Sequence, residues 1–238
     1  MFPIRDHNPS GRTPHVTLAL IMLNVAMFLL TAPWAGGEVG LWHRLALYPA
    51  AIAHGRWLWG LLTHMFLHAG IMHIAGNMLF LWVFGDNLED QMGPWGFLAF
   101  YLACGLAAAA GEIAADPAGT VPMVGASGAI AGVMGGYLLM FPRARVEVIA
   151  IIVIIIRRFV IPAWVLLLAW FALQVYSGAR MADDGVAYVA HAAGFLAGIA
   201  LALPLFLRRG GPAFWRRAGG RPPGGAEFAP SRIPQVRR

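Results

Sequence analysis

The sequence predicts an all-α integral membrane protein with six membrane-spanning helices and a long interfacial loop between the first two. Three observations predict this class. The chain of 238 residues is 59% hydrophobic and only 12% charged, which is about half the charged share of a soluble domain. Several apolar runs approach the roughly 20 residues that a helix needs to cross a bilayer. The basic residues gather between these runs and at the two ends of the chain.

The first expected span covers residues 16–32 and follows a polar leader. It lacks a convincing cleavage site, so we expect it to be retained and not removed as a signal peptide. The connection that follows, residues 33–69, contains Trp42, Trp57 and Trp59, and tryptophans at this density are typical of the headgroup region. The other spans are expected at about residues 70–88, 95–115, 125–141, 160–177 and 186–207.

Residues 146–156, "VEVIAIIVIII", do not fit this series. They are strongly apolar and β-branched, with arginines on both sides. A helix of this length would reach only about 16 Å, roughly half of the hydrocarbon thickness. We therefore predict an embedded or interfacial loop on the cytoplasmic side.

The basic residues orient the expected spans. All seventeen are arginines, and most lie in the leader, in the loop after the fourth span and in the tail. Six spans put these segments on one side, and the positive-inside rule places that side, with both termini, in the cytoplasm. A basic chain can also bind nucleic acid, but arginines that flank apolar spans are topology signals, so no nucleic-acid partner is expected.

The expected organisation has three parts. Residues 1–15 form a cytoplasmic leader, residues 16–207 form the six-helix domain, and residues 208–238 form a cytoplasmic tail rich in Arg, Gly and Pro that is expected to be disordered. A single cysteine, Cys104, excludes an intrachain disulfide and a cysteine-based metal site. No cofactor is expected.

Four polar side chains fall at one depth in this topology. Ser127, His191, His73 and Asn77 lie near the outer ends of the fourth, sixth and second spans, within about 10 Å of the outer boundary at 1.5 Å of rise per residue. Polar groups inside a span are costly and usually face the interior of the bundle. The four residues therefore form a candidate site.

Glycines predict how two of these helices meet. Gly128 and Gly132 recur at a spacing of four in the fourth span, and Gly194 and Gly198 do so in the sixth. Small residues at this spacing let helix backbones approach closely. If Gly128 faces Gly194, the hydroxyl and the imidazole of the candidate site differ in height by only about 3 Å and reach hydrogen-bonding distance.

These residues fit acyl-transfer chemistry. His73 and Asn77 lie on one face of their helix, and both can donate hydrogen bonds to a developing oxyanion together with the backbone N–H of Ser127. Each residue also has a structural alternative. Ser127 could cap a helix, and His191 could be a packing residue. His73 and Asn77 could form structural hydrogen bonds between helices. His64 and His68 lack acidic or cysteine partners at ligand spacing, so no metal is expected.

Three segments together resemble the signatures of the rhomboid intramembrane serine proteases. They are "HIAGNMLFLWVFGDNLED" at residues 73–90, "GASGAIAG" at 125–132 and "AHAAGFLAG" at 190–198. The leader "MFPIRDHNPS" and the segment "LLTHMFLHAG" resemble bacterial members. The resemblance covers residues 1–207, and it implies a multi-pass protein of the bacterial inner membrane.

The resemblance also implies roles. Ser127 would be the nucleophile and His191 its general base, with His73 and Asn77 as side-chain contributors to the oxyanion hole and no essential third carboxylate. The family cleaves single-span membrane proteins near the outer membrane face, favouring small residues at the cut and helix-weakening residues nearby. Transmembrane protein substrates and the lipid bilayer are therefore the expected partners.

Two positions depart from the family pattern. Gly60 stands where many members have an arginine, and Ala131 stands where some have a tyrosine that packs on the histidine. The second departure predicts that something else orients His191. A non-catalytic relative that binds transmembrane helices in the same groove is the alternative function. A transporter would need a polar path or an inverted repeat, and we see neither.

Overall fold

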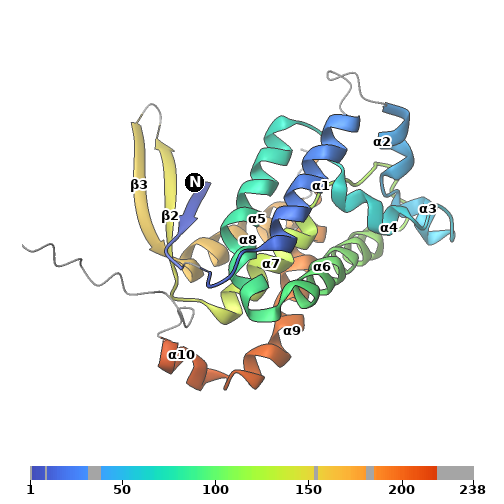
Figure 1. Cartoon of the computed structure of the whole chain (residues 1–238). Helices are drawn as coiled ribbons and strands as arrows, with labels where there is room; N and C mark the ends of the chain where they lie inside the picture. The colour runs from blue at the N-terminus through green and yellow to red at the C-terminus, as the bar shows by residue number, and fades with distance from the viewer. Residues whose placement is uncertain (1, 9, 32–38, 153–154, 181–184, 219–238) are drawn as a thin grey trace, which may run out of the picture.

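The computed structural model describes residues 2–8, 10–31, 39–152, 155–180 and 185–218. Six long helices dominate it (Figure 1), and each overlaps one expected span. They are α1 (His15–Thr31), α5 (Ile71–Met92), α6 (Pro94–Ala115), α7 (Ser127–Met140), α8 (Ala163–Ala179) and α9 (Tyr188–Arg208).

Helix α7 is the centre of the molecule. It carries no charge, and eleven of its fourteen residues are buried. Helices α5, α6, α8 and α9 pack around it, so the main hydrophobic core follows its length. A helix that is apolar on all sides is expected inside a bundle and not at its surface. The residue that begins this helix is Ser127.

By length and hydropathy alone, fewer than six of the described helices qualify as membrane spans. Helices α6 and α9 are long and apolar enough to cross a membrane. A third span results if α5 is joined to the bent segment before it, at an angle of 92°. Helices α1, α7 and α8 are apolar but only 14 to 17 residues long. The prediction of a helical membrane bundle is confirmed in class, and the count of six stays a prediction.

The prediction of an all-α fold is wrong at one place. Strands β2 (Arg145–Ile152) and β3 (Ile155–Pro162) pair antiparallel as a hairpin. We predicted an embedded or interfacial loop over residues 146–156 and the start of the fifth span at about residue 160. Strand β1 (Phe2–Asp6) of the leader pairs antiparallel with β2 and completes a three-stranded sheet beside the bundle (Figure 1). The β-branched residues of this segment favour strands over helix.

A buried polar cluster fastens β1 to the helices. The Asp6 carboxylate accepts hydrogen bonds of 2.8 Å from the Tyr137 hydroxyl and from the Asn87 amide, and Asn8 donates to the same hydroxyl. Burial, reinforced by the negative charge of Asp86, raises the pKa of the Asp6 carboxyl to about 7. The leader is therefore anchored to α5 and α7 through a group that titrates near neutrality.

The tail is partly ordered, contrary to the expectation of disorder from residue 208 onward. Residues Pro212–Ala218 form α10, and Phe214 is buried in the core. The indole of Trp215 donates a 2.9 Å hydrogen bond to the Leu139 carbonyl. Two aromatic side chains thus give this short basic segment an apolar face for docking. Residues 219–238 lie outside the described part of the chain.

The connection between α1 and α5 is folded into short helices. They are α2 (Val39–Leu45), α3 (Pro49–Ala53), α4 (Gly60–Thr63) and the 3-10 turn η2 (His64–Phe66). A Cβ at Gly60 would lie 2.9 Å from the Ala46 carbonyl oxygen. Glycine at this position therefore allows a close backbone crossing that an arginine would prevent.

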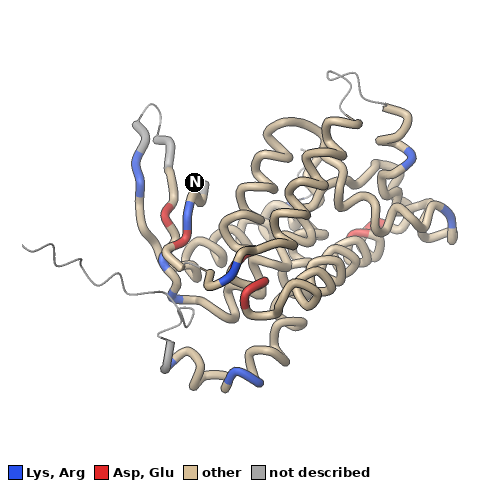
Figure 2. Tube along the Cα trace, in the orientation of Figure 1, with Lys and Arg blue, Asp and Glu red and all other residues tan. Residues whose placement is uncertain are grey.

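Charged residues lie away from the middle of the helices. Figure 2 shows arginines on the hairpin, near α10 and on α2, and acidic residues near the helix ends. One buried acid, Glu89, accepts 2.8 Å hydrogen bonds from the backbone N–H groups of Val16 and Thr17 at the start of α1. Free N–H groups at a helix start favour a carboxylate, so this buried charge is compensated.

Candidate functional site

Ser127 and His191 are in direct contact. The Ser127 Oγ lies 2.7 Å from the His191 Nε2. Ser127 is the first residue of α7, and His191 lies in the first turn of α9. Both side chains are half-buried, so the pair lies within reach from outside the bundle. The two residues that the glycine register predicted to meet do meet.

The glycines bring the two backbones together. A Cβ at Gly194 would fall on the carbonyl oxygen of Gly128, and a Cβ at Gly198 would fall on that of Gly132. In the structure Gly194 thus lies against Gly128 and Gly198 against Gly132, which is the register that the glycine spacing predicts. On the α7 side, a Cβ at Gly128 or Gly132 would instead collide with α6. Gly128 and Gly132 thus relieve crowding against α6. Gly135 of α7 instead faces α9, because a Cβ there would fall on the Phe195 carbonyl oxygen, and the α9 glycines relieve crowding against α7.

Gln174 holds the imidazole and takes the orienting role that Ala131 cannot fill. Its Oε1 lies 2.8 Å from the His191 Nδ1, and its amide nitrogen donates a 3.4 Å hydrogen bond to the Trp170 carbonyl. An amide oxygen only accepts, so the Nδ1 carries the proton and the Nε2 of a neutral ring accepts the serine proton. The site predicted from the sequence does not include Gln174, although an amide side chain within the apolar run "AWVLLLAWFALQV" is a signal of function.

His73 lies beside the serine. A Cβ at Gly125 would be 2.8 Å from the His73 Nε2 and 3.4 Å from the Ser127 Oγ, so the imidazole and the hydroxyl flank one glycine. Gly125 has φ of +129°, which strongly favours glycine. The Ala69 N–H donates to the His73 Nδ1 at 3.4 Å. The Nε2 of a neutral ring therefore carries the proton on the side of the serine.

Asn77 lies one helical turn after His73 on the same face of α5 and is buried. Its amide nitrogen has no hydrogen-bond partner in the described part of the chain. Leaving a buried donor unsatisfied costs about 1–3 kcal/mol, and such groups occur at functional sites. No hydrogen bond joins Asn77 to Ser127 among the described residues, although their helices α5 and α7 pack against each other.

Glu112 of α6 fixes the start of α9. Its carboxylate accepts a 3.0 Å hydrogen bond from the backbone N–H of Ala190, the residue before His191. This acid lies at the outer end of the third expected span, and the sequence pattern does not single it out. It satisfies a free N–H of the first turn and thereby fixes the position of the helix that carries the imidazole.

The arrangement suits nucleophilic catalysis. It combines a hydroxyl bonded to an imidazole, an acceptor that orients this imidazole, and nearby donors in His73, Asn77 and the free N–H of the first residue of α7. Within the described ranges, no group of three His, Cys, Asp or Glu side chains could hold a metal ion. His68 packs edge-on against His73, with ring centroids 5.1 Å apart.

Comparison with known proteins places these residues in a family. A family model described as a Rhomboid domain matches residues 55–208, well over half of the chain. Rhomboid protease GluP of Bacillus subtilis is 40% identical over 129 residues, which cover 52% of this chain and 24% of that protein. Rhomboid protein 1, mitochondrial, of Saccharomyces cerevisiae is 31% identical over 140 residues, covering 56% and 38%. Rhomboid-related protein 2 of Mus musculus is 29% identical over 165 residues, covering 62% and 48%.

The chain spans about a quarter to a half of the length of these relatives. The matched domain includes α5, α6, α7, α8 and α9, and with them every residue of the site described above. Together with its apolar helices, the match identifies a multi-pass membrane protein. The chain therefore belongs to the rhomboid family.

Proposed function

We propose that this protein is an intramembrane serine endopeptidase that uses Ser127 as the nucleophile and His191 as the general base. The single observation that carries the proposal is the 2.7 Å contact between the Ser127 Oγ and the His191 Nε2, with the His191 Nδ1 held by Gln174. A relative that is 40% identical over 129 residues is named a rhomboid protease, which supports the same chemistry.

The reaction begins when the Ser127 oxygen attacks a peptide carbonyl carbon and its proton passes to the His191 Nε2. The backbone N–H of Ser127, the His73 Nε2–H and the free amide of Asn77 are the groups available to the oxyanion. As the tetrahedral intermediate collapses, the His191 Nε2 donates its proton to the leaving amine. Water then attacks the acyl carbon and gives a proton to the same nitrogen. The bond between the acyl carbon and the Ser127 Oγ breaks as His191 returns that proton to the serine oxygen, which releases the acid and restores the enzyme.

The substrate is a transmembrane segment that can unwind. A helix hides its peptide carbonyls in its own hydrogen bonds, and lipid offers no replacement partners. Segments with Gly, Pro or polar residues near the cut are therefore cleaved in preference to uniform leucine helices. In the proposed six-span topology both termini face the cytoplasm and the site lies near the outer face, shallow enough for water to enter.

A serine-reactive fluorophosphonate probe tests the enzymatic function directly. The full-length protein in detergent is expected to be labelled and to cleave a reporter with a Gly/Pro-containing transmembrane segment. Ser127→Ala should abolish both, whereas Ser177→Ala, which changes a serine of α8 outside the site, should abolish neither. Folded wild-type protein that is neither labelled nor active on any such reporter would exclude the protease.

The alternative function is a non-catalytic binder of transmembrane helices. The presence of both Ser127 and His191 in contact favours the protease. The two functions are distinguished in cells by two measurements on the wild type and Ser127→Ala, namely binding of the transmembrane reporter and its cleavage. A binder retains capture and has no processed product in either protein, whereas a protease retains capture and loses the product.

A further inference from the structure

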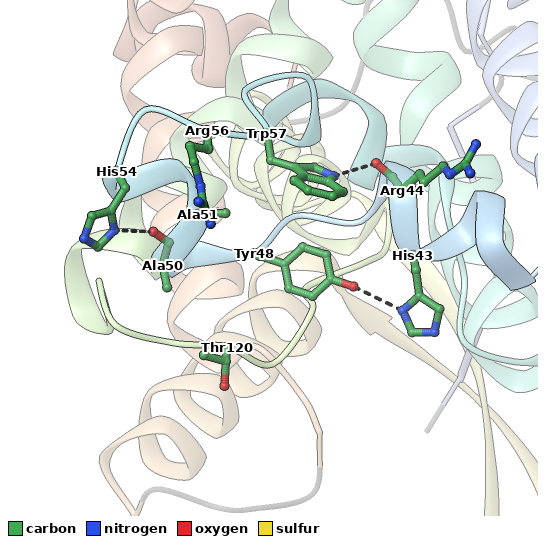
Figure 3. Close-up of a pocket in the computed structure, with 9 residues that line it drawn as sticks. All are labelled: His43, Arg44, Tyr48, Ala50, Ala51, His54, Arg56, Trp57 and Thr120. Carbon is green, nitrogen blue, oxygen red and sulfur yellow. Dashed lines mark hydrogen bonds between the residues drawn. The ribbon is translucent and has the colours of Figure 1, made fainter.

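A cavity of about 740 Å³ lies in the connection between α1 and α5, apart from the serine–histidine pair (Figure 3). Its volume is typical of pockets for small molecules, which range from about 300 to 1,000 Å³. None of the residues that line it is acidic, and the set mixes basic, aromatic and small side chains. They are His43, Arg44, Tyr48, Ala50, Ala51, His54, Arg56, Trp57 and Thr120.

The two arginines of this cavity differ in direction. In Figure 3 the Arg56 side chain runs toward Ala51, among the lining residues, whereas the Arg44 side chain extends away from them. No carboxylate in the described part of the chain forms an ion pair with Arg56. A guanidinium without a partner, placed at an apolar wall, is a binding group for an anion, above all for a phosphate.

The aromatic part of the lining is held in place at a conformational cost. Trp57 is the one residue other than glycine with positive φ in the described ranges, at +59°, and a bulky residue is disfavoured there. Its indole N–H donates a 2.8 Å hydrogen bond to the Arg44 carbonyl, and its ring lies 6.3 Å from that of Tyr48. Backbone strain of this kind persists where the surroundings impose it and marks candidate functional sites.

The cavity lies at the end of the bundle where α5, α7 and α9 begin. The bridge between Leu47 and Met123 ties this connection to the segment before α7. Exposed tryptophans gather here, with Trp57 at 37% and Trp59 at 54% exposure. Because tryptophan concentrates at the level of lipid headgroups, the group that meets Arg56 in a membrane is a lipid phosphate.

We propose that this cavity binds a phosphate-bearing ligand, with Arg56 as its counter-ion and the Trp57 and Tyr48 rings as the apolar wall. In the membrane, an anionic phospholipid of the outer leaflet supplies the ligand. The basic side chain can bind the phosphate of a lipid and the aromatic rings can contact its apolar portion. A free anion would contact the basic side chain alone. This inference does not depend on the catalytic activity.

The test compares two lipids that share their acyl chains. The full-length protein in detergent is titrated with dioleoyl phosphatidylglycerol or with dioleoyl glycerol, and the melting temperature is followed. Only the phosphate-bearing lipid should raise it. Arg56→Gln should raise the half-maximal lipid concentration roughly tenfold or more, since a charge-assisted contact is lost.

Arg143→Gln is the matched control, because it removes the same charge from an exposed arginine between α7 and α8 that does not line the cavity. It should leave the titration within about twofold of the wild type, far from the tenfold effect of a lost charged contact. Equal effects of the two variants, or equal effects of the two lipids, would overturn the site. If inorganic phosphate alone at millimolar concentration reproduces the shift and Arg56→Gln removes it, the phosphate site stands and its ligand is a soluble anion.

Discussion

At the scale of single residues, the candidate site depends on one amide. Gln174 is buried, and its oxygen is the acceptor for the His191 Nδ1–H. This contact selects the ring tautomer that can take the serine proton. In a Ser-His-Asp triad a carboxylate orients the histidine. Here the neutral amide of Gln174 occupies that position.

Gln174→Ala should lower kcat by roughly tenfold or more with little change in KM, because a buried N–H loses a hydrogen bond of about 1.5 kcal/mol and each 1.4 kcal/mol is about tenfold in rate. Gln174→Glu, which retains an acceptor, should retain more activity than the alanine variant. Cleavage of a transmembrane reporter in detergent measures both. Gln91→Ala, at the far end of α5, is the control, and an effect as large as that of Gln174→Ala would contradict a specific role.

Asp6 predicts a dependence of stability on pH. In the folded protein its carboxyl has a pKa of about 7, against 3.8 for an ordinary aspartate. Over this interval the folded state holds a proton that the unfolded chain has lost, so stability falls as pH rises from about 4 toward 7.

Asp6→Asn should flatten this dependence, because an amide retains an acceptor for Tyr137 but does not ionise. The melting temperature of the wild type should fall relative to the variant between pH 5 and pH 8, by at least about 3 °C. Asp116→Asn, which changes an exposed acid between α6 and α7, should behave as the wild type does. Parallel curves for Asp6→Asn and wild type would refute the prediction.

At the scale of elements, the contact of α7 with α9 is the part of the fold that the sequence specifies best. Four-residue glycine spacing predicts a close helix pair, and Gly194 and Gly198 lie against the backbone carbonyls of Gly128 and Gly132. The register follows from this contact, and with it the distance between the serine and the histidine.

Gly194→Ala should therefore separate the helices. Its Cβ has no flexible side chain to displace, only the Gly128 carbonyl, and overpacking of this kind costs about 1–3 kcal/mol. Both the melting temperature and probe labelling of Ser127 should decrease. Gly76→Ala on α5, where a Cβ meets nothing within 4 Å, is the matched control and should preserve labelling. Normal labelling of Gly194→Ala would show that the close approach is dispensable.

Other elements could not be predicted by the same reasoning. Residues 146–156 have the β-branched composition of a strand, but one of the two partners of β2 is the distant β1, whose Phe2 pairs with Ile149. Nothing local in β1 or β2 indicates this pairing. Helix α10 is too short for a periodic pattern, and it is docked by Phe214 and Trp215. In both cases contacts distant in sequence decide the structure.

The departures from the family pattern show a similar limit. The sequence indicates that Gly60 and Ala131 are unusual, but only the structure supplies the neighbours that explain Gly60. Those neighbours are the Ala46 carbonyl and Leu47. Gln174 bonds the imidazole that the family's tyrosine would otherwise contact. The hydroxyl, the base and the helix register were predictable, whereas the residues that orient them come from other helices.

At the scale of the whole molecule, the proposed topology makes the two ends of the bundle face different compartments. The exposed residues Ala118, between α6 and α7, and Arg143, between α7 and α8, lie at opposite ends of α7. The single native cysteine, Cys104, is fully buried, so an introduced thiol can be labelled with little background.

Ala118→Cys should react with a membrane-impermeant maleimide in intact cells, and Arg143→Cys should react only after the membrane is opened. This follows from the placement of both termini in the cytoplasm by the positive-inside rule. The reverse pattern would invert the topology, and labelling of both in intact cells would exclude a complete membrane crossing by α7.

Gln174, which orients His191, lies on α8, a helix with few buried residues. Only four of the seventeen residues of α8 are buried, and Gln174 is one of them. Lateral pressure from lipid, or a neighbouring helix pushing against this flank, acts on α8 before it acts on the enclosed α7. A sideways shift of a few ångströms would withdraw the amide oxygen and leave the imidazole free to rotate. In the proposed protease, cleavage would then respond to the mechanical state of the bilayer without any change at the serine itself.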